Sequence, residues 1–193
     1  MPQRFRSSVG NAAEFLLTTR PRRAVIVGGM NRELRFKDMQ IRPFTKDDAE
    51  ETAQMIAETL RTSNSRDYSE QYIESNITSH SADELIKASD ERHMYVVCDG
   101  ERIVGTGGIA GYWGSLTESI LLTIFVLPEY QGKGVGRKII EMLEKDEYYL
   151  RAKRIEIPAS ITAVEFYRKM GYDYKNGNTE LENGLMYRLE KFR

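Results

Sequence analysis

From Met39 onward, the spacing of hydrophobic positions switches between strand and helix periods. Residues 39–44 alternate as a strand, and Thr45 followed by Asp48 is the capping pattern of a helix start. The helix has an apolar stripe at Ala49, Ala53, Ile56, Ala57 and Leu60. The polar segment 61–92 predicts one or two short helices, the first capped by Ser69 and the second over residues 82–88.

The second half of the chain predicts six strands and two helices. Strands are expected at 93–98 and 102–110, joined by the hairpin pair Asp99-Gly100, and at 119–127, 153–159, 172–175 and 185–192. A helix of about four turns is expected to end at Leu150. A second helix, with Thr162 and Glu165 as its capping box, is expected to end at Gly171. This order predicts an α/β domain with one mixed sheet.

One stretch, LLTIFVLPEYQGKGVGRKIIEML at residues 121–143, joins a strand to a helix through a glycine-rich turn. The apolar run stops at Pro128, and Gly132, Gly134 and Gly136 precede the helix. Unpaired N–H groups and the macrodipole favour an anion at a helix start, and glycines let a ligand approach the backbone. The stretch therefore predicts a phosphate site.

A second glycine run, GTGGIA at residues 105–110, matches the dinucleotide-binding fingerprint by letter. The residues that follow it, GYWGSLTES, do not form an amphipathic helix, so the context of that fingerprint is missing. We interpret the run as a strand whose glycines admit a close neighbour or ligand. The triphosphate-binding pattern GxxxxGK followed by Ser or Thr is absent from the sequence.

Composition narrows the class of ligand. The 193 residues are 40% hydrophobic and 30% charged, as in a globular protein, and no apolar run reaches the roughly 18 residues of a membrane span. The net charge of −1 divides into +5 over residues 1–38 and −6 over the rest, and an acidic body argues against nucleic acid. One cysteine and two histidines supply neither an internal disulfide nor a metal cluster. Cytoplasmic location is expected.

The first 38 residues differ from the remainder. They are rich in arginine and resemble a targeting segment in composition, but their apolar part is short for a secretory core. We expect residues 1–38 to be an extension, either a disordered tail or an over-extended start, because Met30 and Met39 are both plausible first residues. Residues 39–193 form the expected domain.

The glycine turn resembles a known signature. VLPEYQGKGVG at residues 126–136 is similar to the acyl-coenzyme A (acyl-CoA) motif of the GNAT superfamily of N-acetyltransferases, Arg/Gln-x-x-Gly-x-Gly/Ala, through Gln131, Gly134 and Gly136. A second segment, SITAVEFYRKMGYDY at residues 160–174, resembles the family's N-x-x-A-x-x-F-Y-x-K-x-G-F pattern. Ser160 stands there in place of asparagine and Tyr172 in place of phenylalanine. The resemblance covers residues 39–193 and implies a mostly antiparallel mixed sheet flanked by about four helices.

The resemblance implies which residues hold the donor, acetyl-CoA. The pyrophosphate is expected on the N–H groups of the loop, with charge from two basic side chains: Gln131, Gly132, Lys133, Gly134, Val135, Gly136 and Arg137. The pantetheine arm is expected along the strand at Ile124, Phe125 and Val126, where a backbone N–H near Val126 polarises the thioester carbonyl. Ser160 either contacts the donor or substrate or caps the helix.

The resemblance also implies the catalytic roles. Tyr167 is the expected general acid for the leaving thiolate, and it also contacts the donor. Glu118, just before the central strand, is the candidate base, either directly or through water. His93 precedes a strand far from the expected cleft. No metal is expected.

The expected function is transfer of an acetyl or short acyl group to a primary amine by direct attack in a ternary complex. Two alternatives stay open: an acyl-CoA sensor or scaffold without turnover, and a different phosphate-ligand binder that uses the same loop. Expected partners are acetyl-CoA and an amine-bearing small molecule or peptide, without nucleic acid or membrane, and a homodimer is the family expectation. The segments 62–91 and 111–117 are expected to line the acceptor side, but their sequence has no diagnostic pattern for the acceptor.

Overall fold

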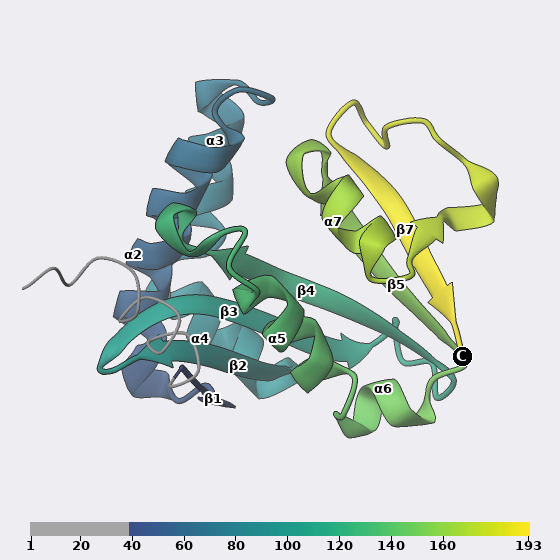
Figure 1. Ribbon diagram of the computed structural model, residues 1–193, viewed down its shortest axis with the longest axis horizontal. Helices are drawn as coiled ribbons and strands as arrows, with labels where there is room; N and C mark the ends of the chain where they lie inside the picture. Colours follow the sequence, from purple (N-terminus) through teal and green to yellow (C-terminus); the bar gives the residue numbers. More distant parts are fainter. Residues whose placement is uncertain (1–38) are drawn as a thin grey trace, which may run out of the picture.

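Seven strands form one mixed sheet in the order β1-β2-β3-β4-β5-β7-β6 in the computed structural model, which describes residues 39–193 (Figure 1). Every neighbouring pair is antiparallel except β4 and β5, which are parallel. The predicted mixed, mostly antiparallel sheet is thus confirmed. The strands are β1 Gln40–Pro43, β2 His93–Asp99, β3 Arg102–Gly111, β4 Glu118–Val126, β5 Arg154–Ser160, β6 Asp173–Tyr174 and β7 Met186–Phe192.

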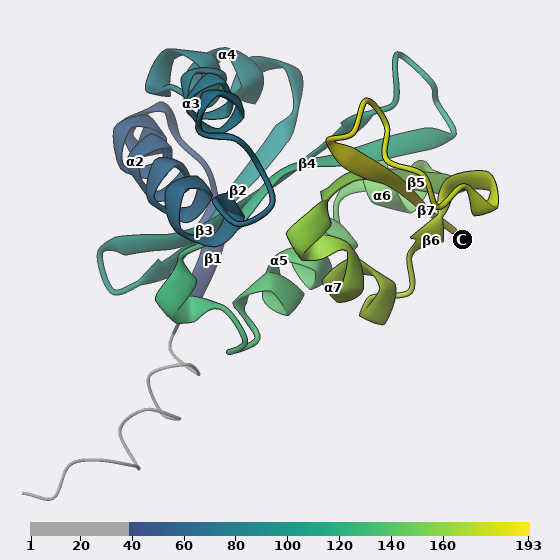
Figure 2. The same ribbon diagram turned by 90° about the horizontal axis from the view of Figure 1, so that it is seen from above.

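Six α-helices cover the two faces of the sheet in the described part of the chain, where about four were expected (Figure 2). Helices α2, α3 and α4 lie on one face, and α5, α6 and α7 lie on the other. Their bounds are α2 Ala49–Thr59, α3 Glu70–Thr78, α4 Ala82–Glu91, α5 Val135–Leu143, α6 Glu147–Arg151 and α7 Val164–Lys169. A π-helical turn, Leu60–Asn64, extends α2, and short 3₁₀ turns occupy Lys46–Asp48, Pro128–Tyr130, Ile161–Ala163 and Lys175–Gly177.

Several helix ends follow the sequence signals. The Thr45–Asp48 pair forms, with the Asp48 carboxylate accepting from the Thr45 N–H at 2.7 Å. The predicted cap Ser69 accepts from the N–H of Tyr72 at 3.3 Å, and Ser81 caps α4 in the same way. Gly171, at φ 88°, follows the end of α7 in the left-handed conformation that glycine adopts without strain.

The prediction of one unbroken helix to Leu150 is wrong, because α5 ends at Leu143 and a separate helix, α6, begins at Glu147. The cause is Asp146, which accepts from the Tyr148 N–H at 2.8 Å as the cap of α6. The same buried carboxylate accepts from the Tyr95 hydroxyl at 2.7 Å and contacts His93 at 2.9 Å, both from β2. Contacts with another strand therefore break a pattern that is helical by periodicity alone.

Two local turn predictions are also wrong. Asp99 pairs with Arg102, so the hairpin turn consists of Gly100 and Glu101, with Gly100 at φ 64°. Thr162 does not cap α7. Its hydroxyl donates to Asp67 Oδ2 at 2.6 Å, across the site described below, and a 3₁₀ turn takes the place of the expected cap.

The glycines of β3 allow α5 to pack directly on the sheet. A Cβ at Gly107 would lie 2.4 Å from Ile139 Cγ2, and one at Gly105 would lie 3.2 Å from both Ile139 Cδ1 and Val135 Cγ1. This bears out the interpretation of GTGGIA as a strand that admits a close neighbour. The approach fixes the start of α5 beside the end of β4, where the glycine turn lies.

Strand β4 is bent by a bulge at its centre. Thr106 pairs with Phe125 and Gly108 with Leu122, so Thr123 and Ile124 both oppose Gly107. Thr123 has a positive φ of 54°. Bulges of this kind bend the strand that carries the extra residue.

Strands β4 and β5 pair only at their first residues, Glu118–Ile120 with Arg154–Glu156. Beyond that point the two strands diverge, as Figure 1 shows. The divergence opens the sheet between β4 and β5, and the functional site is there.

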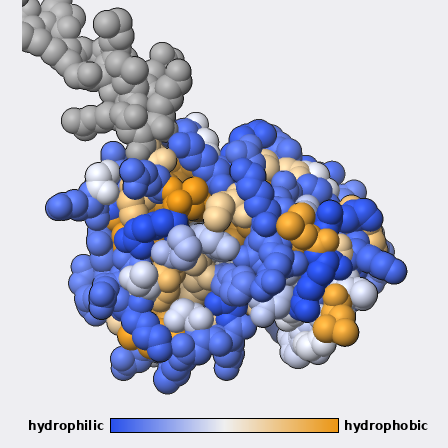
Figure 3. Space-filling view, turned by 90° about the horizontal axis from the view of Figure 1, so that it is seen from below, coloured by the Kyte–Doolittle hydropathy of each residue, from blue (hydrophilic) through white to orange (hydrophobic). Residues whose placement is uncertain are grey.

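The expectations for residues 1–38 lie outside the described residues. Among residues 39–193, no helix is both long and apolar enough to cross a membrane. On the face that Figure 3 shows, hydrophobic residues form small separate groups within a mostly hydrophilic surface.

Candidate functional site

A cleft of about 790 Å³ lies where β4 and β5 diverge. Its walls come from the end of α2 and the following turn, from α3, from residues 121–126 of β4, from the glycine turn, from the end of β5 and from α7. The cleft therefore joins the two sequence motifs, which are about thirty residues apart.

The glycine turn forms one end of the cleft. Gly132 and Gly134 have φ values of 70° and 88°, which are costly for residues with a Cβ. The first helical hydrogen bond of α5 runs from the Lys138 N–H to the Gly134 carbonyl, so the three preceding N–H groups have no acceptor within the helix. Of the predicted clamp, Gln131, Gly132, Gly134, Gly136 and Arg137 line the cleft, and Lys133 and Val135 do not.

The side chain of Gln131 holds this turn in place. Its amide donates to the Val126 carbonyl and to Ser63 Oγ, both at 2.9 Å. Gly136 has a packing role, because a Cβ there would lie 3.0 Å from Cζ of Phe166 on α7. Both residues thus tie the turn to elements on opposite sides of the cleft.

The end of β4 presents an open edge to the cleft through Ile124, Phe125 and Val126. The Leu127 N–H donates to the Val104 carbonyl of β3 at 3.0 Å. Because successive peptide groups of a strand point in opposite directions, the Val126 N–H is directed away from β3, toward the cleft. This is the donor expected for the thioester carbonyl.

Tyr167 and Ser160 line the opposite wall. The Tyr167 side chain is buried, and burial raises its pKa well above the usual value near 10, so the phenol is neutral at physiological pH. Ser160 precedes the 3₁₀ turn Ile161–Ala163, and its side chain makes no capping hydrogen bond. The alternative of a capping role for Ser160 therefore has no support in the geometry.

The structure does not bring Glu118 to the cleft. Glu118 lies at the paired end of β4, and its carboxylate contacts Arg154 Nη2 at 2.7 Å. The hydrogen bond from Arg154 lowers the pKa of this carboxyl, which weakens it as a base. Arg154 also contacts Glu156 and Glu190, so Glu118 belongs to an ion-pair network that joins three strands.

His80, which the sequence did not single out, lies on the cleft wall. Its Nδ1 is 2.9 Å from the Asn76 carbonyl, which only accepts, so Nδ1 carries the proton. Within residues 39–193, Nε2 has no hydrogen-bond partner. The ring meets Phe125 edge-on at 5.2 Å between centroids, and burial lowers the pKa of His80 below 6.5. Sequence offers no signal for it, since His80 follows a polar helix without a motif.

The other histidine is elsewhere. His93 contacts Asp146 at 2.9 Å, its ring is tilted against that of Tyr148 on α6, and it does not line the cleft. This agrees with the expectation that His93 lies far from the site.

Aromatic side chains from α3 and the turn before it complete the wall. Tyr68 and Tyr72 stack with centroids 4.8 Å apart. The Tyr68 hydroxyl accepts from the Ile161 N–H at 2.9 Å and donates to the Leu185 carbonyl at 2.7 Å. Tyr68 thereby links the helical side of the cleft to the β5–β7 side.

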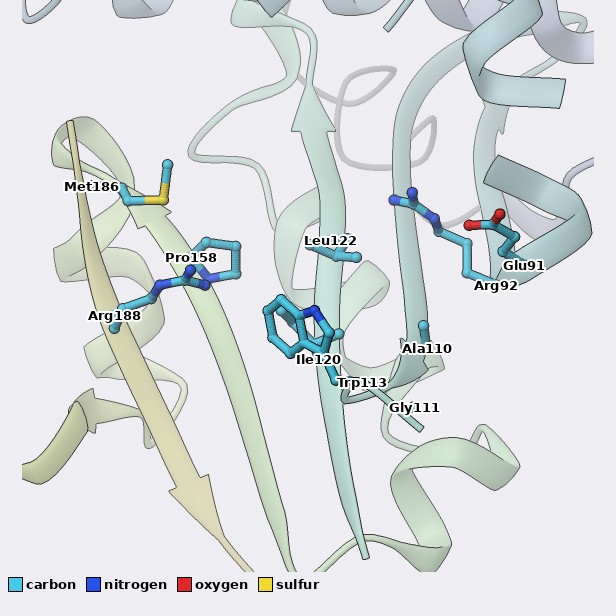
Figure 4. A pocket seen from close by; sticks show the side chains of 10 residues that line it. All are labelled: Glu91, Arg92, Ala110, Gly111, Trp113, Ile120, Leu122, Pro158, Met186 and Arg188. Carbon is cyan, nitrogen blue, oxygen red and sulfur yellow. The ribbon is translucent and has the colours of Figure 1, made fainter. Parts of the chain in front are cut away.

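A second hollow of about 520 Å³ adjoins the cleft (Figure 4). The two share Arg92, Leu122, Pro158 and Met186, so they are continuous across the gap between β4 and β5. Figure 4 shows Trp113 over Ile120, with Arg92 on one side of the hollow and Arg188 on the other. Trp113 is 74% exposed, which is unusual for an indole.

No group of three or more His, Cys, Asp or Glu side chains suited to a metal ion occurs among residues 39–193. The charged groups that face the cleft are basic: Arg92, Arg137 and Lys169. The site is thus arranged for an anionic ligand held by backbone and cationic groups.

Comparison with known proteins identifies this arrangement. The sequence model of the acetyltransferase (GNAT) domain matches residues 48–188. No curated protein matches the sequence significantly.

Solved structures with the same fold include the PaiA N-acetyltransferase from Thermoplasma acidophilum in complex with coenzyme A. It has a TM-score of 0.69 at 19% identity and covers 80% of this chain and 99% of its own. A GCN5-related N-acetyltransferase from Rhodopseudomonas palustris has a TM-score of 0.67 at 25% identity, with coverages of 80% and 95%. An aminoglycoside 6'-N-acetyltransferase complexed with coenzyme A has a TM-score of 0.58 at 18% identity, with coverages of 79% and 96%. The family match spans well over half of the sequence and includes both motifs, so the chain belongs to the GNAT family of acetyltransferases.

Proposed function

We propose that this protein transfers an acetyl or another short acyl group from acetyl-CoA to a primary amine, by direct attack within a ternary complex. The observation that carries the proposal is the continuous opening between β4 and β5. The glycine turn lies at one end of it and a second hollow at the other. Two substrates entering from opposite ends meet at the bulge of β4. Alignment of two bound reactants contributes up to roughly 7–11 kcal/mol to such a reaction.

The donor would bind along the loop and strand. The free N–H groups at the start of α5, with Arg137, suit the pyrophosphate. The open edge of β4 at residues 124–126 suits the amides of the pantetheine arm, as an added strand. The Val126 N–H would then stabilise the oxyanion that forms as the amine attacks.

Tyr167 would act on the leaving group. Its phenol is neutral because burial raises the pKa, so it has a proton to donate to the thiolate sulfur of coenzyme A. Stabilising that sulfur favours breakage of the carbon–sulfur bond over return of the amine.

His80 would act on the amine. A primary amine with a pKa near 10.4 is mostly protonated at pH 7, and freeing its lone pair costs about 4–5 kcal/mol. The Asn76 carbonyl fixes the proton on Nδ1, which leaves Nε2 as the acceptor. The lowered pKa keeps the imidazole neutral, and therefore able to accept a proton, at neutral pH.

An acyl-CoA sensor without turnover is the second candidate, and it makes a different prediction. Purified protein with acetyl-CoA and a panel of polyamines, amino acids, aminoglycosides and peptides should release free thiol at an amine-dependent rate. Binding of acetyl-CoA without any amine-dependent thiol release would instead favour the sensor. The homodimer and the cytoplasmic location stay predictions.

Gly134→Glu should weaken coenzyme A binding at least about 100-fold, because it adds a strained left-handed residue and a negative charge at the proposed pyrophosphate site. Isothermal titration measures this. Gly177→Glu is the matched control, since Gly177 also has a positive φ of 70° with nothing within 4 Å of its Cβ position, and it does not line the cleft. Equal affinity in the two variants would place the ligand elsewhere.

Tyr167→Phe should lower kcat by about 100-fold or more while the dissociation constant for acetyl-CoA changes little, because only proton donation is lost. Tyr172→Phe is the control. The Tyr172 hydroxyl is also buried, has no hydrogen-bond partner among the described residues and does not line the cleft. If kcat is unchanged in Tyr167→Phe, this tyrosine has a packing role only.

The kcat of the wild type should fall as the pH drops through the lowered pKa of His80, below about 6.5, because the base is present only above that pKa. His80→Gln should lower the plateau by about 100-fold and remove this acidic limb. His93→Gln should retain both the plateau value of kcat and the acidic limb, because His93 lies outside the cleft. A His80→Gln variant that keeps the wild-type pH profile contradicts the assignment.

A further inference from the structure

We propose that Arg92 is an anion-binding residue of the acceptor site, and that the acceptor is an amine which also carries a carboxylate, as an amino acid does. The inference rests on the proposed acetyl transfer and adds the chemical class of the acceptor. It depends on the position of Arg92, on the groups around its guanidinium, and on the charges that line the opening.

Arg92 is placed at the meeting point of the two substrates. It follows α4 in an extended conformation and is one of the residues that line both the cleft and the second hollow. Its Cδ lies 3.4 Å from the Cβ position of Gly108, so the missing side chain there gives the arginine stem room over β3. Its Nη1 donates to Thr123 Oγ1, at the bulge of β4, at 3.2 Å.

The guanidinium of Arg92 has donors to spare. It is half-buried, and within residues 39–193 it forms no ion pair and has Thr123 as its hydrogen-bond partner. A guanidinium carries five N–H donors in a planar fork that matches a carboxylate. Burial lowers the pKa of Arg92, and the neighbouring charge of Glu91, with which it forms no ion pair, offsets part of this effect. A bound carboxylate would supply the counterion.

Arg188, on the other side of the same hollow, provides the contrast (Figure 4). Its guanidinium contacts the carboxylates of Glu182 and Glu156, the latter at 3.3 Å, so its charge is already neutralised by the protein. The hollow therefore has two arginines, and Arg92 is the one that forms no ion pair among the described residues.

The remaining charges argue against a polycationic acceptor. Among its described lining residues the cleft has no Asp or Glu, and Glu91 is the one carboxylate that lines the second hollow. Arg92, Arg137 and Lys169 are positive. A polyamine or an aminoglycoside would place additional positive charges next to Arg92, and Glu91 would be the one carboxylate lining the two hollows to balance them. An amine with a carboxylate close to it brings the missing negative charge.

The position of the carboxylate also suits the chemistry. Anchored at Arg92, it would lie beside Thr123, two residues before the Phe125 ring that His80 contacts. Arg92 and His80 line the same cleft, and burial, together with the charge of Arg92, lowers the pKa of His80, so the two side chains lie near each other. A small amino acid held at Arg92 would therefore present its amine toward Nε2 of His80 and the open edge of β4.

The test compares acceptors that differ only in the anion. Thiol release is measured with the twenty amino acids and their carboxamides, with spermidine and kanamycin as cationic amines, and with phosphoethanolamine as a phosphate-bearing amine. For the best amino acid, kcat/KM should exceed that of its amide by at least about tenfold, the size expected for one charge-assisted hydrogen bond.

Arg92→Gln should bring the ratio close to one, and Arg92→Lys should restore part of it. Arg168→Gln, a surface variant outside both hollows, should leave it unchanged.

A second readout does not need turnover. In the presence of coenzyme A, N-acetyl amino acids, the proposed products, should raise the melting temperature of the wild type more than that of Arg92→Gln, and their amides should not. This shift separates the two proposals: absence of thiol release with a retained, Arg92-dependent shift overturns acetyl transfer and supports the carboxylate site.

Four outcomes overturn the inference. In the first, amides or cationic amines are acetylated as efficiently as the free amino acids; in the second, phosphoethanolamine is the one acceptor that reacts. In the third, Arg92→Gln changes the KM of acetyl-CoA and leaves the KM of the acceptor unchanged. In the fourth, the melting temperature shows no shift that depends on Arg92. Retained coenzyme A affinity in Arg92→Gln shows that the variant is folded.

Discussion

The parallel pairing between β4 and β5 ends after three residues, and the whole site depends on that ending. Arg154 ties the paired end together, because its guanidinium contacts Glu118 on β4, Glu156 on its own strand and Glu190 on β7. Glu156 is fully buried, and removing one partner from such a network leaves an uncompensated charge, which is strongly destabilising. Past the network, the bulge at Thr123 bends β4, and the strand edges separate.

The separation gives the protein its two kinds of recognition. An open strand edge offers unpaired backbone groups, and a glycine turn at a helix start offers more of them, so the side proposed for the donor consists largely of backbone. The side proposed for the acceptor consists of side chains, among them Arg92, His80 and Trp113. Backbone recognition depends on a few glycines at fixed spacing, whereas side-chain recognition depends on residues that come from separate elements. This is the physical reason why the donor could be predicted from the sequence and the acceptor could not.

The sequence predicted most of the fold, and its failures have specific causes. The strands, the Ser69 cap and the C-terminal glycine of α7 follow from local pattern. The break between α5 and α6 does not, because Asp146 is held by Tyr95 from a distant strand. In the same way, Glu118 was the candidate base because the resemblance places a glutamate near the central strand. The Glu118 carboxylate instead pairs with Arg154, thirty-six residues later in the chain, as part of an ion-pair network.

The sequence by itself indicated the family and predicted the glycine turn as a phosphate site and Tyr167 as the acid, since each prediction rests on a short stretch with fixed spacing. Only the tertiary structure decided which other side chains line the cleft. His80 and Arg92 lie in a polar segment with no motif, and they reach the site because α3 and α4 pack over a sheet that opens between β4 and β5. The spacing of residues within a short stretch predicts its backbone conformation. Whether side chains from different elements meet depends on how far apart two strands lie, and no single stretch of sequence specifies that distance.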